Sequence, residues 1–279
     1  MANLLDGKKL AADHRRLLAQ KISRLPQAPH LAVILVGDDE ASHLYVNLKA
    51  KAAQEVGIKF SRYLYPANTA QREIISLIEK CNQTTDINGI LVQLPLPNHL
   101  DENAIIKTIN PNKDADGFHP LNIQNFLNDK PGNLTPGLIT GIMKLIRLAG
   151  QNLTNKQAYI LANSQEFAQP LSKALTDQAV NVTLDNQLNK TRAQTADIII
   201  TALGKPHFLT GDCFKDGAII IDVGTSKQNG KTVGDIKDDD LVNRLVYLTP
   251  VPGGVGPMTV AELLWTVYLL YCRQHNIKF

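Results

Sequence analysis

The sequence predicts an α/β protein built from two parallel α/β lobes. The chain has 279 residues, which at about 150 residues per domain corresponds to two domains. Two series of short apolar runs alternate with amphipathic segments, and a loop-rich stretch over residues 95–136 separates the two series. Short apolar runs that alternate with helical segments are typical of parallel sheets, whose strands are buried on both faces.

The composition excludes several classes of protein. Hydrophobic residues make up 44% of the chain and charged residues 20%, which excludes a disordered chain. The 29 basic residues nearly balance the 26 acidic ones, so we expect neither a nucleic acid nor a membrane surface as a partner. The three cysteines form no CxxC pair and no metal-ligand spacing, which predicts a cytoplasmic protein without a metal site.

The two end segments predict helices rather than membrane spans. The first twenty residues hold no apolar run of the length of a signal peptide, and they predict an amphipathic helix with Leu10, Leu17 and Leu18 on one face. The apolar run over residues 261–272 is 12 residues long, whereas a bilayer span needs about 20. We therefore expect a buried or interface helix there.

The first α/β series runs from residue 31 to residue 94. The predicted elements are a strand over 31–37, a helix over 42–58, a strand over 60–65, a helix over 71–82 and a strand over 89–94. Gly57 stands where a helix C-cap is expected, because glycine adopts the left-handed conformation without strain. Strand, helix and strand in this order predict a parallel sheet.

The second series supplies five further strands. They are predicted over 158–162, 180–184, 197–203, 218–224 and 245–250, with helices over 138–148 and 170–178 and a last helix from residue 259. Five strands with intervening helices are typical of a Rossmann-like dinucleotide-binding lobe. In both series, polar motifs follow the strands at their carboxyl ends, where open parallel sheets place their ligands.

One group of residues has the chemistry of a general base. Tyr45 and Lys49 are four residues apart in a predicted helix and share one face, and Gln93 ends a neighbouring strand. A lysine that loses solvation has a lowered pKa, so its neutral amine becomes available as a base. Taken alone, the commoner arrangement for such a pair is a surface lysine whose stem packs along the tyrosine ring.

Two loops have patterns that suggest a ligand. Residues 113–120, KDADGFHP, lack the later glutamate of a calcium loop, so we expect a carboxylate that accepts N–H donors from a heterocycle. The alternative is an Asx-turn. Residues 250–259, PVPGGVGPMT, combine proline and glycine between a strand and a helix, which favours close approach of the backbone to a ligand over a merely rigid turn.

Taken together, these motifs resemble the methylenetetrahydrofolate dehydrogenase/cyclohydrolase family of one-carbon folate metabolism. The resemblance extends over nearly the whole chain through YVNLKAKAAQEVGI, GILVQLPLP, NPNKDADGFHPLN, LTPG, GKP, GAIIIDVG, GKTVGDI and TPVPGGVGPMTVAELL. It implies two α/β lobes with a cleft between them and a homodimer formed through the Rossmann-like lobe. It also implies two reactions, which are the oxidation of 5,10-methylenetetrahydrofolate with NAD(P) and the hydrolysis of the methenyl product to 10-formyltetrahydrofolate.

The resemblance also implies roles for individual residues. Lys49 is expected to be the catalytic lysine, tuned by Gln93, with Tyr45 packed on the folate. Asp116 is expected to hold the edge of the pterin. The residues expected to line the folate side of the cleft are Pro252, Gly253 and Gly254. The folate lobe is expected over residues 1–123 and 260–279, and the Rossmann-like lobe over residues 124–259.

The dinucleotide side departs from the family pattern. Where the family has V-G-R-S-x-I-V-G-x-P, residues 161–170 read LANSQEFAQP, so both glycines are alanine and Asn163 replaces the arginine. The family's C-H-S corresponds to residues 185–187, DNQ. The loss of the arginine removes a bidentate partner for the 2′-phosphate of NADP. The residues expected to bind the cofactor are Asn163, Ser164, Asp185, Gly204 and Thr225.

Three hypotheses follow for the cofactor. In the first, NADP is bound through other contacts such as Lys190 or Arg192. In the second, Asp185 accepts a hydrogen bond from the ribose 2′-hydroxyl of NAD, since it ends the second strand about 20 residues after the turn. In the third, dinucleotide binding is lost, which leaves a cyclohydrolase or a folate-binding paralogue. Lys49 together with Gln93 favours an enzyme, because a pure binder needs no base. NADP is the expected cofactor, with NAD as the alternative.

Overall fold

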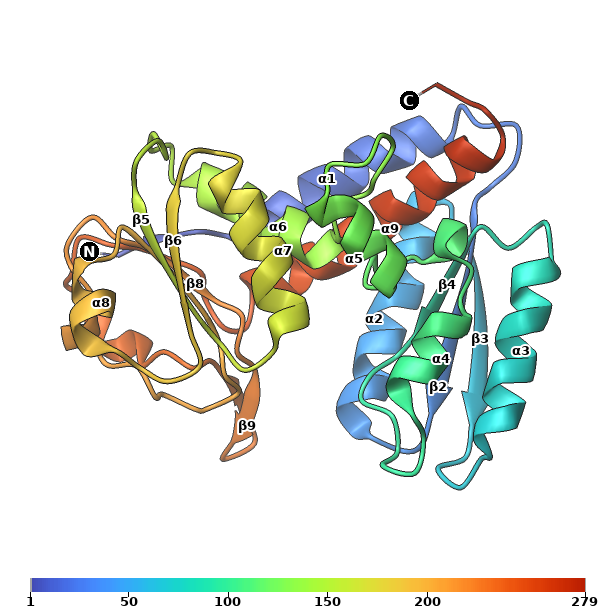
Figure 1. The fold of residues 1–279 in the computed structure, drawn as a ribbon, viewed down its shortest axis with the longest axis horizontal. Coiled ribbons are helices and arrows are strands. Elements are labelled where there is room, and N and C mark those ends of the chain that lie inside the picture. The colour runs from blue at the N-terminus through green and yellow to red at the C-terminus, as the bar shows by residue number, and fades with distance from the viewer. Residues whose placement is uncertain (1, 279) are drawn as a thin grey trace. The chain divides into compact units, whose positions relative to one another are not determined.

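A computed structural model describes residues 2–278 (Figure 1). Contacts between elements divide the chain into two compact units. Unit 1 comprises the residues up to Ala11 together with Leu138–Thr259, and unit 2 comprises Ala12–Gly137 together with the chain from Val260 onward. The fold is mixed α/β with parallel sheets, as predicted.

Residues 2–11 belong to unit 1, whereas the segment that follows them belongs to unit 2. Strand β1 (Asn3–Leu4) pairs in parallel with β11 (Tyr247–Leu248), and the backbone N–H of Leu5 donates to the carbonyl of Leu248 at 2.8 Å. The sequence placed this segment in the other lobe, because two residues are too few to produce a strand pattern. The division after Gly137 also lies 14 residues later than the predicted boundary after residue 123.

Unit 2 is built on a three-stranded parallel sheet in the order β3-β2-β4. The strands are β2 (His30–Val36), β3 (Lys59–Tyr65) and β4 (Gly89–Val92). The helices are α2 (Glu40–Val56), α3 (Gln71–Gln83), α4 (Glu102–Thr108) and α5 (Pro120–Leu127), and α1 (Gly7–Ile22) and α9 (Val255–Gln274) contribute from Ala12 and from Val260 onward.

Strand β2 is apolar at every buried position because both of its faces are covered. Leu31, Val33 and Leu35 pack in one cluster with α1, α2 and α9, whereas Ile34 and Val36 pack in another with α3 and α4. Helices α2 and α3 accordingly lie on opposite sides of the sheet (Figure 1). Each fully buried aliphatic side chain contributes roughly 1.5–3 kcal/mol, so this strand anchors the unit.

Helix α2 is fixed at both ends. The Asp39 carboxylate accepts the backbone N–H of Ser42 at 2.7 Å as an N-cap. Gly57 ends the helix with φ at 83°, as predicted, and the N–H groups of Gly57 and Ile58 donate to carbonyls of the last turn. The two caps fix the beginning and the end of the helix that carries Tyr45 and Lys49.

Unit 1 holds a six-stranded parallel sheet in the order β1-β11-β8-β7-β5-β6. Its remaining strands are β5 (Gln157–Ala162), β6 (Asn181–Asp185), β7 (Ile198–Ala202) and β8 (Ile219–Asp222). The helices are α6 (Gly137–Leu148), α7 (Gln165–Thr176) and α8 (Lys190–Thr195), and β9 (Ser226–Gln228) and β10 (Lys231–Val233) form an antiparallel hairpin. The strand order reverses between β5 and β7, where doubly wound folds bind their ligands.

Some predicted elements were wrong in extent. The stretch over 95–136 contains α4, α5 and a short 3-10 helix over Pro111–Lys113, because the side chains of Asp101, Asn110 and His119 cap helices where the sequence resembles loops. Helix α7 begins five residues before the predicted start, since Ser164 caps it and Pro170 lies inside it. Leu17 is exposed although Leu18 is buried, so the predicted apolar face of α1 was too wide.

Helix α9 is longer than the apolar run that predicted it. It covers 20 residues, and within residues 2–278 it is the one helix long and apolar enough to cross a membrane. Of its most apolar window, 72% is buried in the protein, which is the pattern of a core helix. Val260, Leu264, Val267 and Tyr271 of this helix all lie in the main apolar cluster of unit 2.

Candidate active site

The predicted general base lies against its predicted partner. Lys49 projects from α2 and is 7% exposed, and its Nζ donates to Oε1 of Gln93 at 2.8 Å. Gln93 directly follows β4, and its Nε2 donates to the carbonyl of Leu94 at 2.6 Å, which fixes the amide with its oxygen toward the lysine. Tyr45 is partly buried one turn before Lys49 on the same helix. The alternative of an exposed surface lysine is therefore wrong.

Opposing effects set the charge of this lysine. Burial lowers the pKa of Lys49, and the carboxylate of Asp116 partly counteracts this by favouring the ammonium. Burial likewise raises the pKa of Asp116, while Lys49 acts in the opposite direction. The two groups therefore form one electrostatic unit in which a change in either charge alters the protonation of the other.

The loop that carries Asp116 is organised by its neighbour Asp114. The buried carboxylate of Asp114 accepts the N–H groups of Gly117 at 3.0 Å and His119 at 2.8 Å, and Nδ2 of Asn122 at 2.9 Å. The Asx-turn that the sequence left as an alternative is therefore the role of Asp114. This frees Asp116, two residues later, for another use.

Two further residues of this loop are structural. Nδ1 of His119 accepts the N–H of Leu121 at 3.1 Å and caps α5. Nζ of the buried Lys113 donates to the carbonyls of Cys81 at 3.0 Å and Thr84 at 2.7 Å. Both side chains hold the loop in place.

In unit 1 the glycines after β11 have separate roles. A Cβ on Gly254 would lie 2.6 Å from Cβ of Thr249, and a Cβ on Gly7 would lie 1.8 Å from the Gly254 carbonyl oxygen. Packing within the chain therefore requires Gly254, as the rigid-turn alternative proposed. Gly253 has φ at 119° and more space around it, and Pro252 is exposed. These two residues are the ones accessible to a ligand.

The predicted dinucleotide residues gather at the carboxyl ends of β5, β7 and β8. Asn163 follows β5, and its Nδ2 donates to the carbonyl of Leu203 after β7 at 2.9 Å, across the point where the strand order reverses. Ser164 caps α7 by accepting the N–H of Phe167 at 3.3 Å. Gly204 has φ at 67° with open space on its Cβ side, and Thr225 is exposed after β8.

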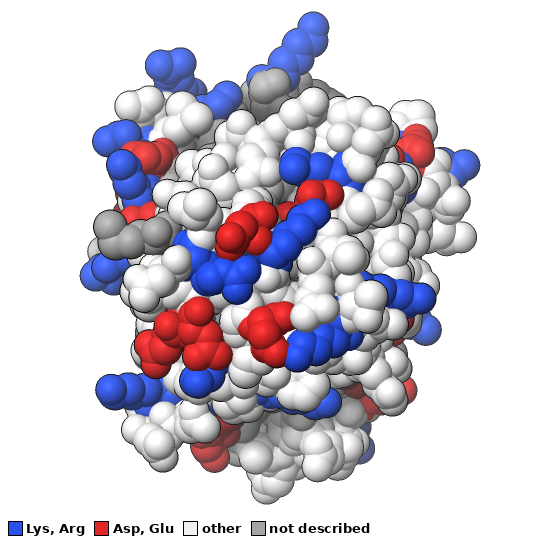
Figure 2. Space-filling model, turned by 90° about the vertical axis from the view of Figure 1, so that its left-hand side faces the viewer, with Lys and Arg blue, Asp and Glu red and all other residues white. Residues whose placement is uncertain are grey.

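Asp185 ends β6, the strand beside β5, and it is paired with a cation. Nη1 of Arg192 donates to both of its carboxylate oxygens, at 3.0 and 2.9 Å. Lys190, on the same short helix as Arg192, pairs with Asp212. On the face drawn in Figure 2, Lys and Arg side chains lie among Asp and Glu side chains, and neither sign forms an area of its own.

Two buried carboxylates, Asp222 and Asp235, form a hydrogen-bond network at the carboxyl ends of β7 and β8 that was not predicted from the sequence. Asp222 at the end of β8 accepts the N–H groups of Gly224, Asp235 and Ile236 at 2.9–3.1 Å. Asp235 accepts the hydroxyl of Thr201 and two further backbone N–H groups, those of Leu203 and Lys205, at 2.7–2.9 Å. The sequence signals for this network were DVG and GDI, which belong to the family motifs GAIIIDVG and GKTVGDI but do not show that the two carboxylates lie together.

Burial raises the pKa of Asp222 to about 7, which predicts a pH-dependent stability. Between pH 4 and 7 the native carboxyl keeps a proton that the unfolded chain releases, so the free energy of unfolding should fall as pH rises, by up to about 1.4 kcal/mol per pH unit. Thermal unfolding of Asp222→Asn should show a shallower fall with pH than the parent. Asp216→Asn, which removes an exposed carboxylate, serves as control. Parallel profiles for Asp222→Asn and the parent would contradict the assignment.

Comparison with known proteins identifies the family. A model of the tetrahydrofolate dehydrogenase/cyclohydrolase catalytic domain matches residues 5–116, and a model of the NAD(P)-binding domain of the same family matches residues 136–275. The chain belongs to this family. The resemblance predicted from the sequence is thereby confirmed, including a domain for a nicotinamide dinucleotide.

Relatives match this family member over nearly its whole length. The bifunctional protein FolD of Streptococcus pyogenes is 43% identical over 276 residues, which cover 96% of this chain and 97% of the relative. The structure of FolD from Campylobacter jejuni is 38% identical with a TM-score of 0.92, covering 98% of this chain and all of that one. A FolD from Trypanosoma brucei, complexed with NADP and an inhibitor, is 30% identical with a TM-score of 0.92 and covers 98% of each chain.

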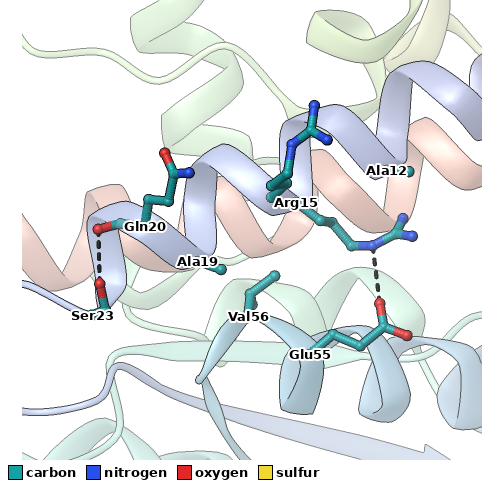
Figure 3. A pocket seen from close by; sticks show the side chains of 8 residues that line it. Ala12, Arg15, Ala19, Gln20, Ser23, Glu55 and Val56 are labelled. Carbon is teal, nitrogen blue, oxygen red and sulfur yellow. Dashed lines mark hydrogen bonds and ion pairs between the residues drawn. The ribbon is translucent and has the colours of Figure 1, made fainter.

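The described surface holds an open pocket away from the predicted site residues. Within residues 2–278, no group of three or more His, Cys, Asp or Glu side chains has the arrangement of a metal site. An open pocket of about 550 Å³ lies between α1 and the end of α2, where Nε of Arg15 is 3.3 Å from Glu55 (Figure 3). Its lining includes Ala19, Gln20 and Val56 and none of the predicted site residues.

Proposed function

We propose that the chain oxidises 5,10-methylenetetrahydrofolate with a nicotinamide dinucleotide and hydrolyses the 5,10-methenyl product to 10-formyltetrahydrofolate. Membership of the tetrahydrofolate dehydrogenase/cyclohydrolase family supports both activities. The observation that carries the proposal is the buried Lys49 bonded to Gln93, with Asp116 acting on its charge. A protein that only binds folate needs no base.

In the hydrolytic step, Lys49 is the proposed base. Water adds to the cationic methenyl carbon, and a proton of that water passes to the neutral Nζ as the new C–O bond forms. In the resulting neutral carbinolamine the hydroxyl loses its proton as the C=O bond forms, the ring C–N bond breaks, and the departing ring nitrogen takes up a proton, which leaves the formyl group. A cationic substrate repels an ammonium, so the burial that lowers the pKa of Lys49 favours the reactive form. The proposed role of Gln93 is to hold the amine in one orientation by accepting its hydrogen bond.

Two further residues are assigned to the folate. We assign Asp116 to the amino and ring N–H groups of the pterin, since a carboxylate accepts two parallel N–H donors well. Tyr45, on the same face of α2 as Lys49, is assigned to packing against the folate ring. Pro252 and Gly253 are assigned to the folate from the loop after β11.

In the oxidative step, the dinucleotide supplies the hydride acceptor. The residues present fit it, because Asn163, Ser164, Gly204 and Thr225 are all exposed at the carboxyl ends of β5, β7 and β8. The step needs no acid or base from the protein, so these residues serve to hold the cofactor in reach of the substrate.

Two assays test the proposal. Purified protein should accelerate the decay of the methenyl absorbance above the buffer rate, and with methylenetetrahydrofolate it should reduce NAD or NADP. Decay at the buffer rate would refute the hydrolytic activity. Hydrolysis without dinucleotide reduction or binding would leave only the cyclohydrolase.

The proposed lobes, assembly and location complete this assignment. Unit 2 is the proposed folate lobe and unit 1 the proposed dinucleotide lobe.

A homodimer through unit 1 is supported by Leu4, Val242 and Leu245, which are each more than half exposed near the edge strand β1. Light scattering of the parent and of Leu245→Asp tests it, since a dimer should dissociate in the variant. The three cysteines are free and buried, which supports a reducing, cytoplasmic setting.

A further inference from the structure

The position of Asp185 allows a sharper statement about the cofactor. Its strand β6 pairs with β5 in a parallel register that sets Leu161 opposite Asp185. In a sheet of this order, the turn after β5 receives the phosphates, and the end of the neighbouring strand faces the ribose of the adenosine. Asp185 is therefore expected beside the ribose hydroxyls of the adenosine. NAD and NADP differ at this position, because only NADP carries a phosphate on the 2′-hydroxyl.

The segment after Asp185 is held rigidly. The hydroxyl of the buried Tyr159 donates to the carbonyl of Gln187 at 3.2 Å and accepts the N–H of Asn189 at 3.0 Å. The Asn189 side chain in turn caps α8 through the N–H of Arg192 at 3.1 Å. The pairing of Asp185 with Arg192 thus rests on a fixed backbone as well as on the two side chains.

The cations near this strand end are already neutralised by carboxylates. Nη1 of Arg192 donates to both carboxylate oxygens of Asp185, and Lys190 is paired with Asp212. At the start of α7, Glu166 accepts the hydroxyl of Ser164 at 2.9 Å and adds a further negative charge beside the neutral Asn163. A 2′-phosphate carries about −1.5 to −2 charges at neutral pH, so it would meet carboxylates here and would have to displace an ion pair to reach a guanidinium.

We propose that Asp185 makes NAD the preferred dinucleotide of this protein, by accepting a hydrogen bond from the ribose 2′-hydroxyl and by repelling a 2′-phosphate. This inference rests on the proposed dehydrogenase function and specifies its cofactor. Arg192 orients the carboxylate while NAD is bound, and it becomes a partner for a 2′-phosphate only when Asp185 loses its charge.

Calorimetric titration of the parent with NAD and with NADP tests the preference directly, without turnover. The dissociation constant for NADP should exceed that for NAD by roughly 10–100-fold, because like charges in contact disfavour binding. In Asp185→Asn, NAD should bind more weakly and NADP more tightly, so that the ratio approaches or passes one. The double variant Asp185→Asn/Arg192→Ala should lose the gain for NADP.

Asp177→Asn is the matched control. It removes an exposed carboxylate that is also paired with a cation, Lys173, but at the opposite end of α7, and the ratio of the two dissociation constants should not change. The melting temperature of every variant, compared with the parent, reports whether the substituted unit 1 is folded.

Several results would overturn the inference. They are NADP bound as tightly as NAD by the parent, an unchanged ratio in Asp185→Asn, or the same shift in Asp177→Asn. If neither dinucleotide binds while hydrolysis persists, the dehydrogenase half of the proposed function fails, and the inference about its cofactor fails with it. If NADP binds more tightly than NAD, the inference alone is wrong.

Discussion

Replacing Lys49 with methionine is expected to lower the rate of methenyltetrahydrofolate hydrolysis by roughly 10²–10⁴-fold, the usual contribution of a general base. Methionine keeps the length of the buried side chain and removes the amine that bonds Gln93 at 2.8 Å. Because an apolar side chain replaces a desolvated amine, folding should be preserved and the melting temperature should not fall. The absorbance decay of the methenyl substrate measures the rate.

The matched control is Lys51→Met, which removes an exposed lysine two residues further along α2 and should leave the hydrolysis rate unchanged. Titration with the dinucleotide should give the parental dissociation constant for both variants, since the proposed cofactor residues belong to unit 1. Undiminished hydrolysis by Lys49→Met would remove Lys49 from the mechanism.

Replacing Asp116 with asparagine should have two separable effects. The KM for the folate should rise about 10–100-fold, the effect of losing a hydrogen bond to a charged group. The pKa of Lys49 should fall further, because the carboxylate that favours the ammonium is gone. Since the neutral amine is the reactive form, the acidic limb of the pH profile for kcat should move to lower pH.

The pH profile distinguishes this electrostatic role from a merely structural one. A variant that only disturbs the loop would lower kcat at every pH without moving the limb. Glu79→Gln, which removes an exposed carboxylate on α3, should reproduce neither effect. A limb that stays in place or moves to higher pH in Asp116→Asn would contradict the coupling of Asp116 with Lys49.

The parts of the fold that the sequence predicted are those with a strong periodic signal. Strands such as β2 and β8 are apolar except at one end, at His30 and Asp222, because nearly all of their side chains are buried, and Gly57 marks a helix end by its conformational freedom. The short elements depend on contacts between distant residues. Strand β1 forms because its backbone pairs with β11, more than 240 residues later in the chain. No local sequence pattern predicts a pairing between such distant segments.

In the candidate site, too, the features with a local sequence pattern were predicted, whereas those that depend on contacts between distant residues were not. The spacing of Tyr45 and Lys49 predicted a shared helix face, whereas the contact of Lys49 with Gln93 required the pairing of β2 with β4. The residues of the loop over 113–120 were recognisable as a set, but their separate roles depend on which carboxylate turns inward. Asp222 and Asp235 lie in two motifs of the family resemblance, but their spacing in the sequence does not show that the folded chain brings them together.

The pairing of β1 with β11 has a consequence for the folding of the protein during its synthesis on the ribosome. Synthesis is vectorial, and domains generally fold as units as they emerge. Here the sheet of unit 1 cannot gain its edge strand until Tyr247 has been made, and unit 2 lacks Val260, Leu264 and Val267 of its core until later still. Both units therefore need residues from Tyr247 onward, so a premature stop codon at or just before Tyr247 would leave two unfinished units rather than one intact and one missing.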